Sequence, residues 1–245
     1  METKVTIPAL QQMKRDGRKI VGVVAWDFQI AQIADRAGVD LISVGDSVGV
    51  NLWGHATDAE VTVDEMLICC KAVRRGAKRA LLSCDIPSRP TRQGAEATAR
   101  AALRLAETGG AQMVKVLGDP GLVRAIVRAG VPVFAEFHGE HVPVDKLVDE
   151  ARRLQDAGAS LLDFRHSGSV AGPAVARAVS IPVIGGLGGG PWLDGRVRLA
   201  HTASGYAAKW VDSKTETYGN AAKLSLEAFE ALIDDVRAGR QIKGG

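Results

Sequence analysis

One pattern recurs along this chain and limits the folds open to it: an amphipathic helix ends at a glycine, and a short apolar segment follows within a few residues. The segments are apolar throughout rather than alternating, which is typical of parallel strands buried on both faces. Strands that alternate with helices predict a parallel sheet covered by helices. The glycines expected to cap these helices in the left-handed conformation are Gly38, Gly76, Gly110, Gly130 and Gly158.

The repeat predicts eight strands, within residues 19–27, 37–45, 75–85, 108–116, 129–137, 157–164, 180–186 and, as the weakest candidate, 203–211. Thr62 and Glu65 form a capping box that begins a helix running to about Gly76. No linker interrupts the series, and 245 residues suit one barrel. We therefore expect an α/β fold, a single (β/α)8 TIM-barrel domain over residues 1–245. An open flavodoxin-like sheet is the alternative, but it usually has fewer strands.

Composition excludes several classes of protein. The net charge is only +3 and the basic residues are dispersed, so nothing indicates a nucleic-acid partner. No apolar run approaches the roughly 20 residues that cross a bilayer, and none resembles a signal peptide, so we expect no membrane association. Cys69, Cys70 and Cys84 have neither metal-binding nor disulfide-framework spacing, which favours a reducing, cytoplasmic environment.

Charged side chains stand where the expected strands end, which in such barrels is where the working groups lie. Asp46 and Asp85 follow the second and third strands. Carboxylates that converge on one mouth repel each other unless a cation or proton lies between them, and Mg²⁺ prefers carboxylate and water oxygens. A divalent-metal site is therefore expected there, although helix capping is the alternative role. The other strand-end candidates are Trp26, Asp27, Ser47, Lys115, Glu136, His138, Asp163, Arg165 and His166.

The segments VGDSVG, EVTVDEM, KAVRRGAKRALLSCDIP, AQMVKV and IPVIGGLGGG, in this order, resemble the signature blocks of the ketopantoate hydroxymethyltransferase family. The resemblance implies a (β/α)8 barrel that binds Mg²⁺ or another divalent cation and a 2-oxo acid, with 5,10-methylenetetrahydrofolate as one-carbon donor. It also implies a homo-oligomer. By position, Asp46 and Asp85 resemble the metal ligands, and Ser47 and Lys115 the groups that hold the carboxylate and carbonyl oxygens of the 2-oxo acid.

The chain departs from the family pattern at three polar positions of this site. The family's Glu two residues after Lys115 is here Leu117, its strand-five His falls on Glu136, and its strand-six Glu, the supposed base, falls on Arg165. An arginine is protonated at neutral pH and cannot act as a base. The family's mechanism therefore cannot be transferred unchanged.

Two interpretations remain open. In the first, the site is altered: Lys115, Glu136 and Arg165 are catalytic, with Glu136 as metal ligand or base and Arg165 binding an additional anionic group on a different substrate. Trp26, Asp27 and His138 then contribute to substrate binding alongside Ser47 and Lys115. In the second, the chain is a non-catalytic, ligand-binding paralogue. The first predicts metal-assisted enolate or aldol-type one-carbon transfer to a 2-oxo acid, and a retro-aldol carbon–carbon lyase like the phosphoenolpyruvate mutase barrels is its nearest variant.

Overall fold

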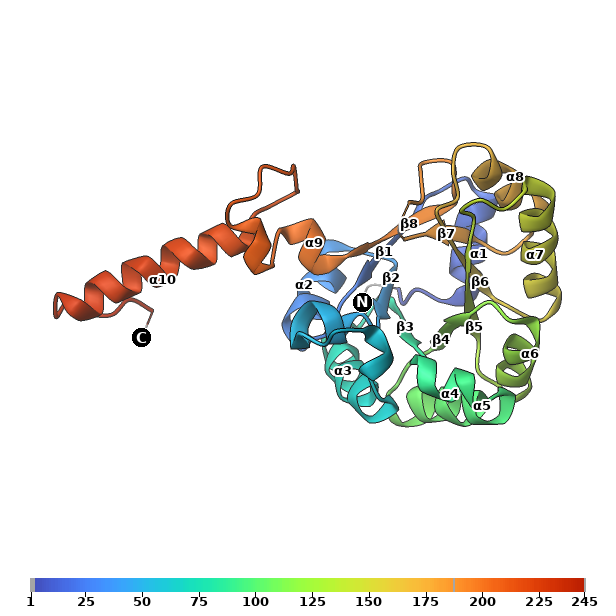
Figure 1. Cartoon of the computed structure of the whole chain (residues 1–245), viewed down its shortest axis with the longest axis horizontal. Coiled ribbons are helices and arrows are strands. Elements are labelled where there is room, and N and C mark those ends of the chain that lie inside the picture. Colours follow the sequence, from blue (N-terminus) through green and yellow to red (C-terminus); the bar gives the residue numbers. More distant parts are fainter. Residues whose placement is uncertain (1–2, 187, 245) are drawn as a thin grey trace. The chain divides into compact units, whose positions relative to one another are not determined.

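The computed structural model describes residues 3–186 and 188–244, and within them eight parallel strands close into a barrel in chain order. Figure 1 shows α1 to α8 around these strands, so the predicted (β/α)8 fold is confirmed. The strands are β1 (Ile20–Val24), β2 (Leu41–Val44), β3 (Leu81–Asp85), β4 (Met113–Leu117), β5 (Val133–His138), β6 (Leu161–Arg165), β7 (Val183–Gly185) and β8 (Gly195–Leu199).

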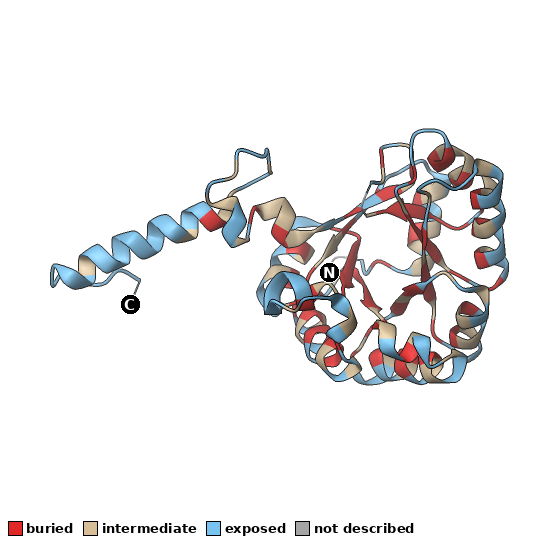
Figure 2. Ribbon diagram, in the orientation of Figure 1, coloured by how far each residue is buried: buried red, intermediate tan, exposed pale blue. Residues whose placement is uncertain are grey.

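Helices α1 to α8 surround the strands, and each has buried residues on one side (Figure 2). The α-helices are α1 (Ile7–Arg15), α2 (Phe28–Ala37), α3 (Val63–Gly76), α4 (Ser88–Arg92), α5 (Ala95–Leu103), α6 (Pro120–Arg128), α7 (Val144–Asp156), α8 (Ala171–Ala178), α9 (Ala200–Ser204) and α10 (Ala221–Arg237). Short π- or 3₁₀-helical turns are η1 (Gly49–Trp53), η2 (Asp58–Glu60), η3 (Arg104–Thr108) and η4 (Ala208–Trp210).

The eighth strand was placed wrongly from the sequence: it is β8, Gly195–Leu199, and residues 203–211 hold the end of α9 and η4. The reason is burial. Arg196 and Arg198 lie on the outer face of β8 and are exposed, so its sequence alternates between polar and apolar residues. A search for continuously apolar strands misses a strand with one exposed face.

Two helix-end predictions had different outcomes. Thr62 accepts from the Glu65 amide and forms the predicted capping box of α3. Gly76, however, is the last residue of α3 and not a left-handed cap. A Cβ on Gly76 would lie 2.6 Å from the Phe28 carbonyl oxygen, so glycine is needed there for the close approach of α2 and α3. The other four predicted glycines do have positive φ.

The barrel interior changes from apolar to polar along its axis. Leu10 and Met13 of α1 pack against an apolar layer in the barrel. This layer contains one residue from each strand: Ile20, Leu41, Leu81, Met113, Phe134, Leu161, Ile184 and Val197. Side chains alternate along a strand, so the residues two positions further on face the same interior. These include Ser43, Ser83, Lys115, Glu136 and Asp163. The barrel interior thus has an apolar layer and, nearer the carboxyl ends of the strands, a polar layer.

The chain divides into two compact units after Arg198. The first contains the barrel, and the second contains α9, η4 and α10. One domain over residues 1–245 stays a prediction. Among the described residues, no helix combines the length and apolar character needed to span a membrane.

Candidate active site

Strand register brings the polar layer together at the carboxyl ends of β3 to β6. Asp85 pairs with Lys115 across β3 and β4, and Glu136 pairs with Asp163 across β5 and β6. His138 pairs with Arg165 one step nearer the mouth. Phe137 and Phe164 stack on the opposite, helix-facing side, which confirms that their neighbours on these strands point inward.

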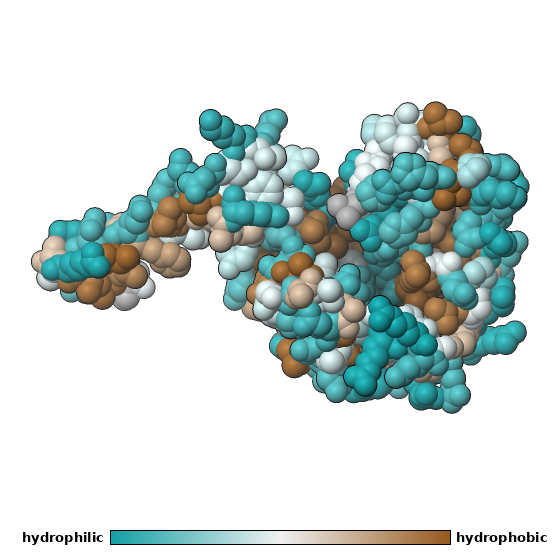
Figure 3. Space-filling model, in the orientation of Figure 1, coloured by the Kyte–Doolittle hydropathy of each residue, from teal (hydrophilic) through white to brown (hydrophobic). Residues whose placement is uncertain are grey.

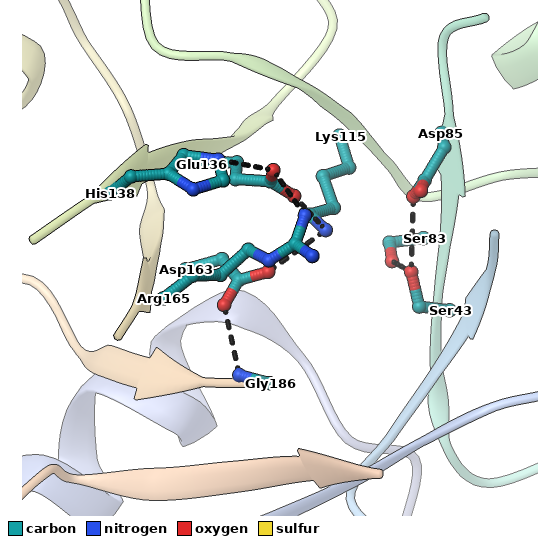
Figure 4. Close-up of polar contacts among 9 residues, drawn as sticks. All are labelled: Ser43, Ser83, Asp85, Lys115, Glu136, His138, Asp163, Arg165 and Gly186. Atoms are coloured by element: carbon teal, nitrogen blue, oxygen red, sulfur yellow. Dashed lines mark hydrogen bonds and ion pairs between the residues drawn. The ribbon is translucent and has the colours of Figure 1, made fainter. Parts of the chain in front are cut away.

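Lys115 lies at the centre of an ion network (Figure 4). Its Nζ is 2.5 Å from Glu136 Oε2 and 2.8 Å from Asp163 Oδ2, and all three side chains are largely buried. Arg165 Nη1 donates to Glu136 Oε1 at 2.8 Å, and the Gly186 amide donates to Asp163 Oδ1 at 3.1 Å. Glu136 therefore contacts two cations, whereas Asp163 contacts one.

The charges of the network fix the protonation of Glu136. Burial by itself raises the pKa of this carboxyl, but the neighbouring Lys115 and Arg165 outweigh it and lower the pKa to about 2. The pKa of Lys115 is raised well above its ordinary value, because Asp163, Asp85 and Glu136 outweigh its burial. Both groups are ionised at neutral pH.

A second polar group lies across the mouth (Figure 4). Ser83 Oγ donates to Ser43 Oγ at 2.7 Å, and Ser43 Oγ donates to Asp85 Oδ1 at 3.4 Å. The two serines pair directly in the register of β2 and β3. Neither was identified as a site residue from the sequence, although a serine within each otherwise apolar strand was a visible signal.

The carboxyl groups of Asp46 and Asp85 both have raised pKa values. Burial, followed by the charge of Asp58, raises the pKa of Asp46 to about 6. Burial also raises the pKa of Asp85 to about 8; Lys115 opposes this shift, and Asp46 and Glu136 add to it. The nearby ammonium thus fails to offset the cost of ionising these two groups.

The donor set fits a hard divalent ion. Within the described residues, no three His, Cys, Asp or Glu side chains are grouped as a metal site. Two carboxylates are too few protein ligands for a typical zinc site, but Mg²⁺ is commonly held by one or two carboxylates with water and substrate oxygens. Asp46 and Asp85 are the residues that would hold it.

The remaining predicted residues take structural contacts as well. Trp26 is buried and its Nε1 donates to the Gly45 carbonyl at 2.9 Å, between the loops after β1 and β2. Asp27 caps α2 by accepting from the Ile30 amide at 2.9 Å. Ser47 is partly buried next to Asp46, and its carbonyl accepts from Asn51. Trp26 thus connects two loops at the mouth of the barrel, and Asp27 stabilises the start of α2.

His138 lies at the mouth, where its side chain is 45% exposed, and its Nε2 is 3.0 Å from Glu136 Oε1. The ring also stacks on His166 with centroids 6.4 Å apart. Leu117, where the resembled family has a glutamate, is exposed on the neighbouring strand. The pair of Glu136 and His138 could not be read from the sequence as a contact, because it depends on side-chain direction in β5.

Comparison with known proteins gives the same family over almost the whole chain. The profile of ketopantoate hydroxymethyltransferase matches residues 4–138 and 137–241. The 3-methyl-2-oxobutanoate hydroxymethyltransferase of Cyanothece sp. strain PCC 7425 is 34% identical, over 95% of this chain and 96% of that protein. The Geobacillus kaustophilus enzyme of the same name is 34% identical over 92% and 87%.

Solved structures share the fold at low sequence identity. Phosphonopyruvate hydrolase, solved with oxalate and Mg²⁺, has a TM-score of 0.66 at 16% identity, covering 98% of this chain and 89% of that one. A 2,3-dimethylmalate lyase of the PEP mutase/isocitrate lyase superfamily has a TM-score of 0.64 at 13% identity, covering 95% and 87%. These likenesses concern the barrel alone. The profile match and the relatives above 30% identity show that the chain belongs to the ketopantoate hydroxymethyltransferase family, a family of transferase enzymes.

Proposed function

We propose that this chain catalyses one-carbon transfer to the enolate of a 2-oxo acid, assisted by a divalent metal ion, on a substrate different from that of its named relatives. The observation that carries the proposal is the mouth itself. Two partly buried carboxylates with raised pKa values, Asp46 and Asp85, interact electrostatically with the partly buried ammonium of Lys115. Such an arrangement suits a ligand that needs both a cation and a positive charge beside its oxygens.

Each residue would have a defined part. Asp46 and Asp85 hold the metal, which when bound supplies Lewis-acid stabilisation of the oxo-acid oxygens. Ser47 and Lys115 bind the carboxylate and carbonyl oxygens, and the Lys115 charge stabilises the enolate oxygen as it forms. Glu136 keeps Lys115 and Arg165 in place through the contacts described above.

Arg165 supports the altered substrate. Its side chain is a quarter exposed, and its guanidinium directs one donor to Glu136. An arginine has five N–H donors in a planar fork, so donors remain for an anion at the mouth. We propose that this anion is a second acidic group on the oxo acid.

Hydrogen–deuterium exchange tests the proposal most directly. The carbon beside the carbonyl of 3-methyl-2-oxobutanoate, and of 2-oxo diacids, is followed by NMR in D₂O with and without Mg²⁺. Metal-dependent exchange is expected, faster for an oxo acid with a second carboxylate. Addition of 5,10-methylenetetrahydrofolate then tests the one-carbon donor. No exchange with any oxo acid refutes the proposal and favours the non-catalytic paralogue, and cleavage of a 2-hydroxy diacid instead favours the lyase.

We also propose that the enzyme acts in the cytoplasm as a homo-oligomer, with α10 as a contact between copies. Ala222, Leu226, Phe229, Ile233 and Val236 are spaced four and three residues apart, which puts them on one side of the helix. All but Ala222 are exposed, and Figure 3 shows apolar surface along this helix. A heptad-spaced stripe on a helix fits another helix of the same kind, so a second copy is the occupant that we propose.

A further inference from the structure

We propose that His138 is the base that removes the proton from the carbon beside the substrate carbonyl, and that Glu136 is the positioning residue that fixes its tautomer. The inference rests on the enolate chemistry proposed above. It assigns the proton transfer to an imidazole, whereas the sequence suggested Glu136 as metal ligand or base.

The two residues share one face of β5. Side chains alternate along a strand, so Glu136 and His138 both point into the barrel, with His138 one step nearer the mouth. His138 is 45% exposed, whereas the Glu136 side chain is 14% exposed beneath it. Figure 4 shows the imidazole next to the Glu136 carboxylate. A substrate at the mouth reaches the ring before it reaches the carboxylate.

Glu136 is poorly suited to take the proton itself. Oε2 is held by Lys115 at 2.5 Å, and Oε1 is held by Arg165 at 2.8 Å. Protonation of this carboxylate would disrupt two charge-assisted contacts, which is why its pKa falls to about 2. A base with such weak proton affinity gives little driving force for removing a proton from carbon at neutral pH.

The same contacts fix the proton on His138. An ionised carboxylate only accepts hydrogen bonds, so the imidazole nitrogen 3.0 Å from Oε1 must be the donor. In the neutral ring, Nε2 therefore carries the hydrogen and Nδ1 carries the lone pair. A carboxylate that orients an imidazole and stabilises its charged form is a recurring device of enzyme bases.

The step balances with the residues present. The carbon–hydrogen bond breaks, and its proton goes to Nδ1 of His138. The electron pair forms the carbon–carbon double bond, and the carbonyl π pair moves to oxygen as the enolate, beside the Lys115 charge. The imidazolium is then paired with Glu136. Arg165, which pairs with His138 in register, and the His166 ring are the other ionisable groups facing it.

Imidazole rescue tests the role of His138. His138→Ala should slow deuterium exchange at the oxo acid by about 10²- to 10⁴-fold, with KM changed by less than about threefold. Added imidazole should restore part of the rate, since the mouth position is open. His141→Asn is the matched control, because His141 is an exposed histidine of the following loop at positive φ, which asparagine tolerates. This variant should exchange at the unaltered rate.

Three outcomes separate the alternatives. Exchange by His138→Ala at the unaltered rate overturns the assignment while leaving the proposed function intact. Loss of exchange with a raised KM and no rescue also overturns it, since His138 would then be a binding or structural residue. Absence of exchange in the unaltered protein refutes the proposed function, and the assignment with it.

The tautomer gives a test that does not depend on turnover. In ¹⁵N-histidine-labelled protein, long-range ¹H–¹⁵N spectra should show Nε2 protonated and Nδ1 bare, with the signal assigned by its loss in His138→Gln. Glu136→Gln replaces an acceptor by a group that also donates, so it should disturb this tautomer and slow exchange without imidazole rescue. A protonated Nδ1 in the unaltered protein, or unchanged exchange in Glu136→Gln, would overturn the positioning role.

Discussion

Glu136 and Asp163 both contact Lys115, but Glu136 also contacts Arg165. This difference predicts how the stability of the barrel changes when Lys115 is replaced. Lys115→Met keeps the length of the side chain but removes the charge from between Glu136 and Asp163, 2.5 and 2.8 Å away. Removing one member of a buried ion pair costs roughly 3–5 kcal/mol, because the remaining charge is left desolvated and unpaired. We expect the free energy of unfolding to fall by about that amount.

The structure also predicts which second substitution restores stability. Glu136 retains Arg165 at 2.8 Å after the change, whereas Asp163 retains, among the described residues, the Gly186 amide at 3.1 Å and no cation within ion-pair distance. Adding Asp163→Asn to Lys115→Met removes the unpaired charge and should recover about 1–3 kcal/mol. Adding Glu136→Gln should recover less, because it would leave Arg165 without its carboxylate.

Urea unfolding at pH 7, followed by circular dichroism and tryptophan fluorescence, measures these differences. Arg104→Met is the control, because Arg104 pairs with Asp64 at an exposed site where such contacts contribute about 0–1 kcal/mol. A cost of Lys115→Met near that of the control would refute the reasoning. Equal recovery of stability by Asp163→Asn and Glu136→Gln would refute the inference that Asp163 depends on Lys115 more than Glu136 does.

Further predictions concern pH, metal and assembly. The folded-state pKa of Glu136, about 2, lies below its ordinary 4.5, so its stabilisation of roughly 3 kcal/mol is present above pH 4.5 and lost as pH falls through 2. The stability difference between the unaltered protein and Glu136→Gln, measured by urea unfolding, should shrink over that interval, and a constant difference contradicts it. Mg²⁺ at about 100 times its Kd should stabilise the protein by about 2.7 kcal/mol in thermal unfolding. The gain should vanish in Asp85→Asn and persist in Asp64→Asn, whose position is exposed; an equal gain in both variants excludes Asp85 as a ligand. Phe229→Glu should reduce the mass seen by light scattering, whereas Ala231→Glu, outside the apolar stripe, should not; an unchanged mass excludes α10 as the contact.

The sequence predicted the barrel because its strands are buried on both faces, which makes them apolar throughout. β8 escaped detection because its outer face is exposed and its sequence alternates. Gly76 was predicted as a left-handed cap, since a close helix approach and a left-handed turn both require glycine and look alike in one sequence. Both errors came from tertiary surroundings that a local pattern does not contain.

Site residues were easier to place at the mouth than to pair. Strand ends indicated Asp85, Lys115, Glu136 and Arg165, and the structure brings the last three into one network. The partners of each group depend on register and on the alternation of side chains across neighbouring strands. For that reason the contact of Lys115 with Asp163 was not foreseen.

Charge balance connects the altered positions to the metal. The charges that act on the mouth are those of the cations Lys115 and Arg165 and of a larger set of carboxylates: Asp46, Asp58, Asp85, Glu136 and Asp163. Carboxylates therefore outnumber cations at the mouth, and this excess of negative charge adds to burial in raising the pKa values of Asp46 and Asp85. A divalent ion bound there would reduce that excess of negative charge. Glu136 and Arg165 pair with each other at 2.8 Å and offset each other's charge, so these altered positions leave the excess negative charge at Asp46 and Asp85 in place. That excess supports our proposal that Asp46 and Asp85 hold a divalent cation.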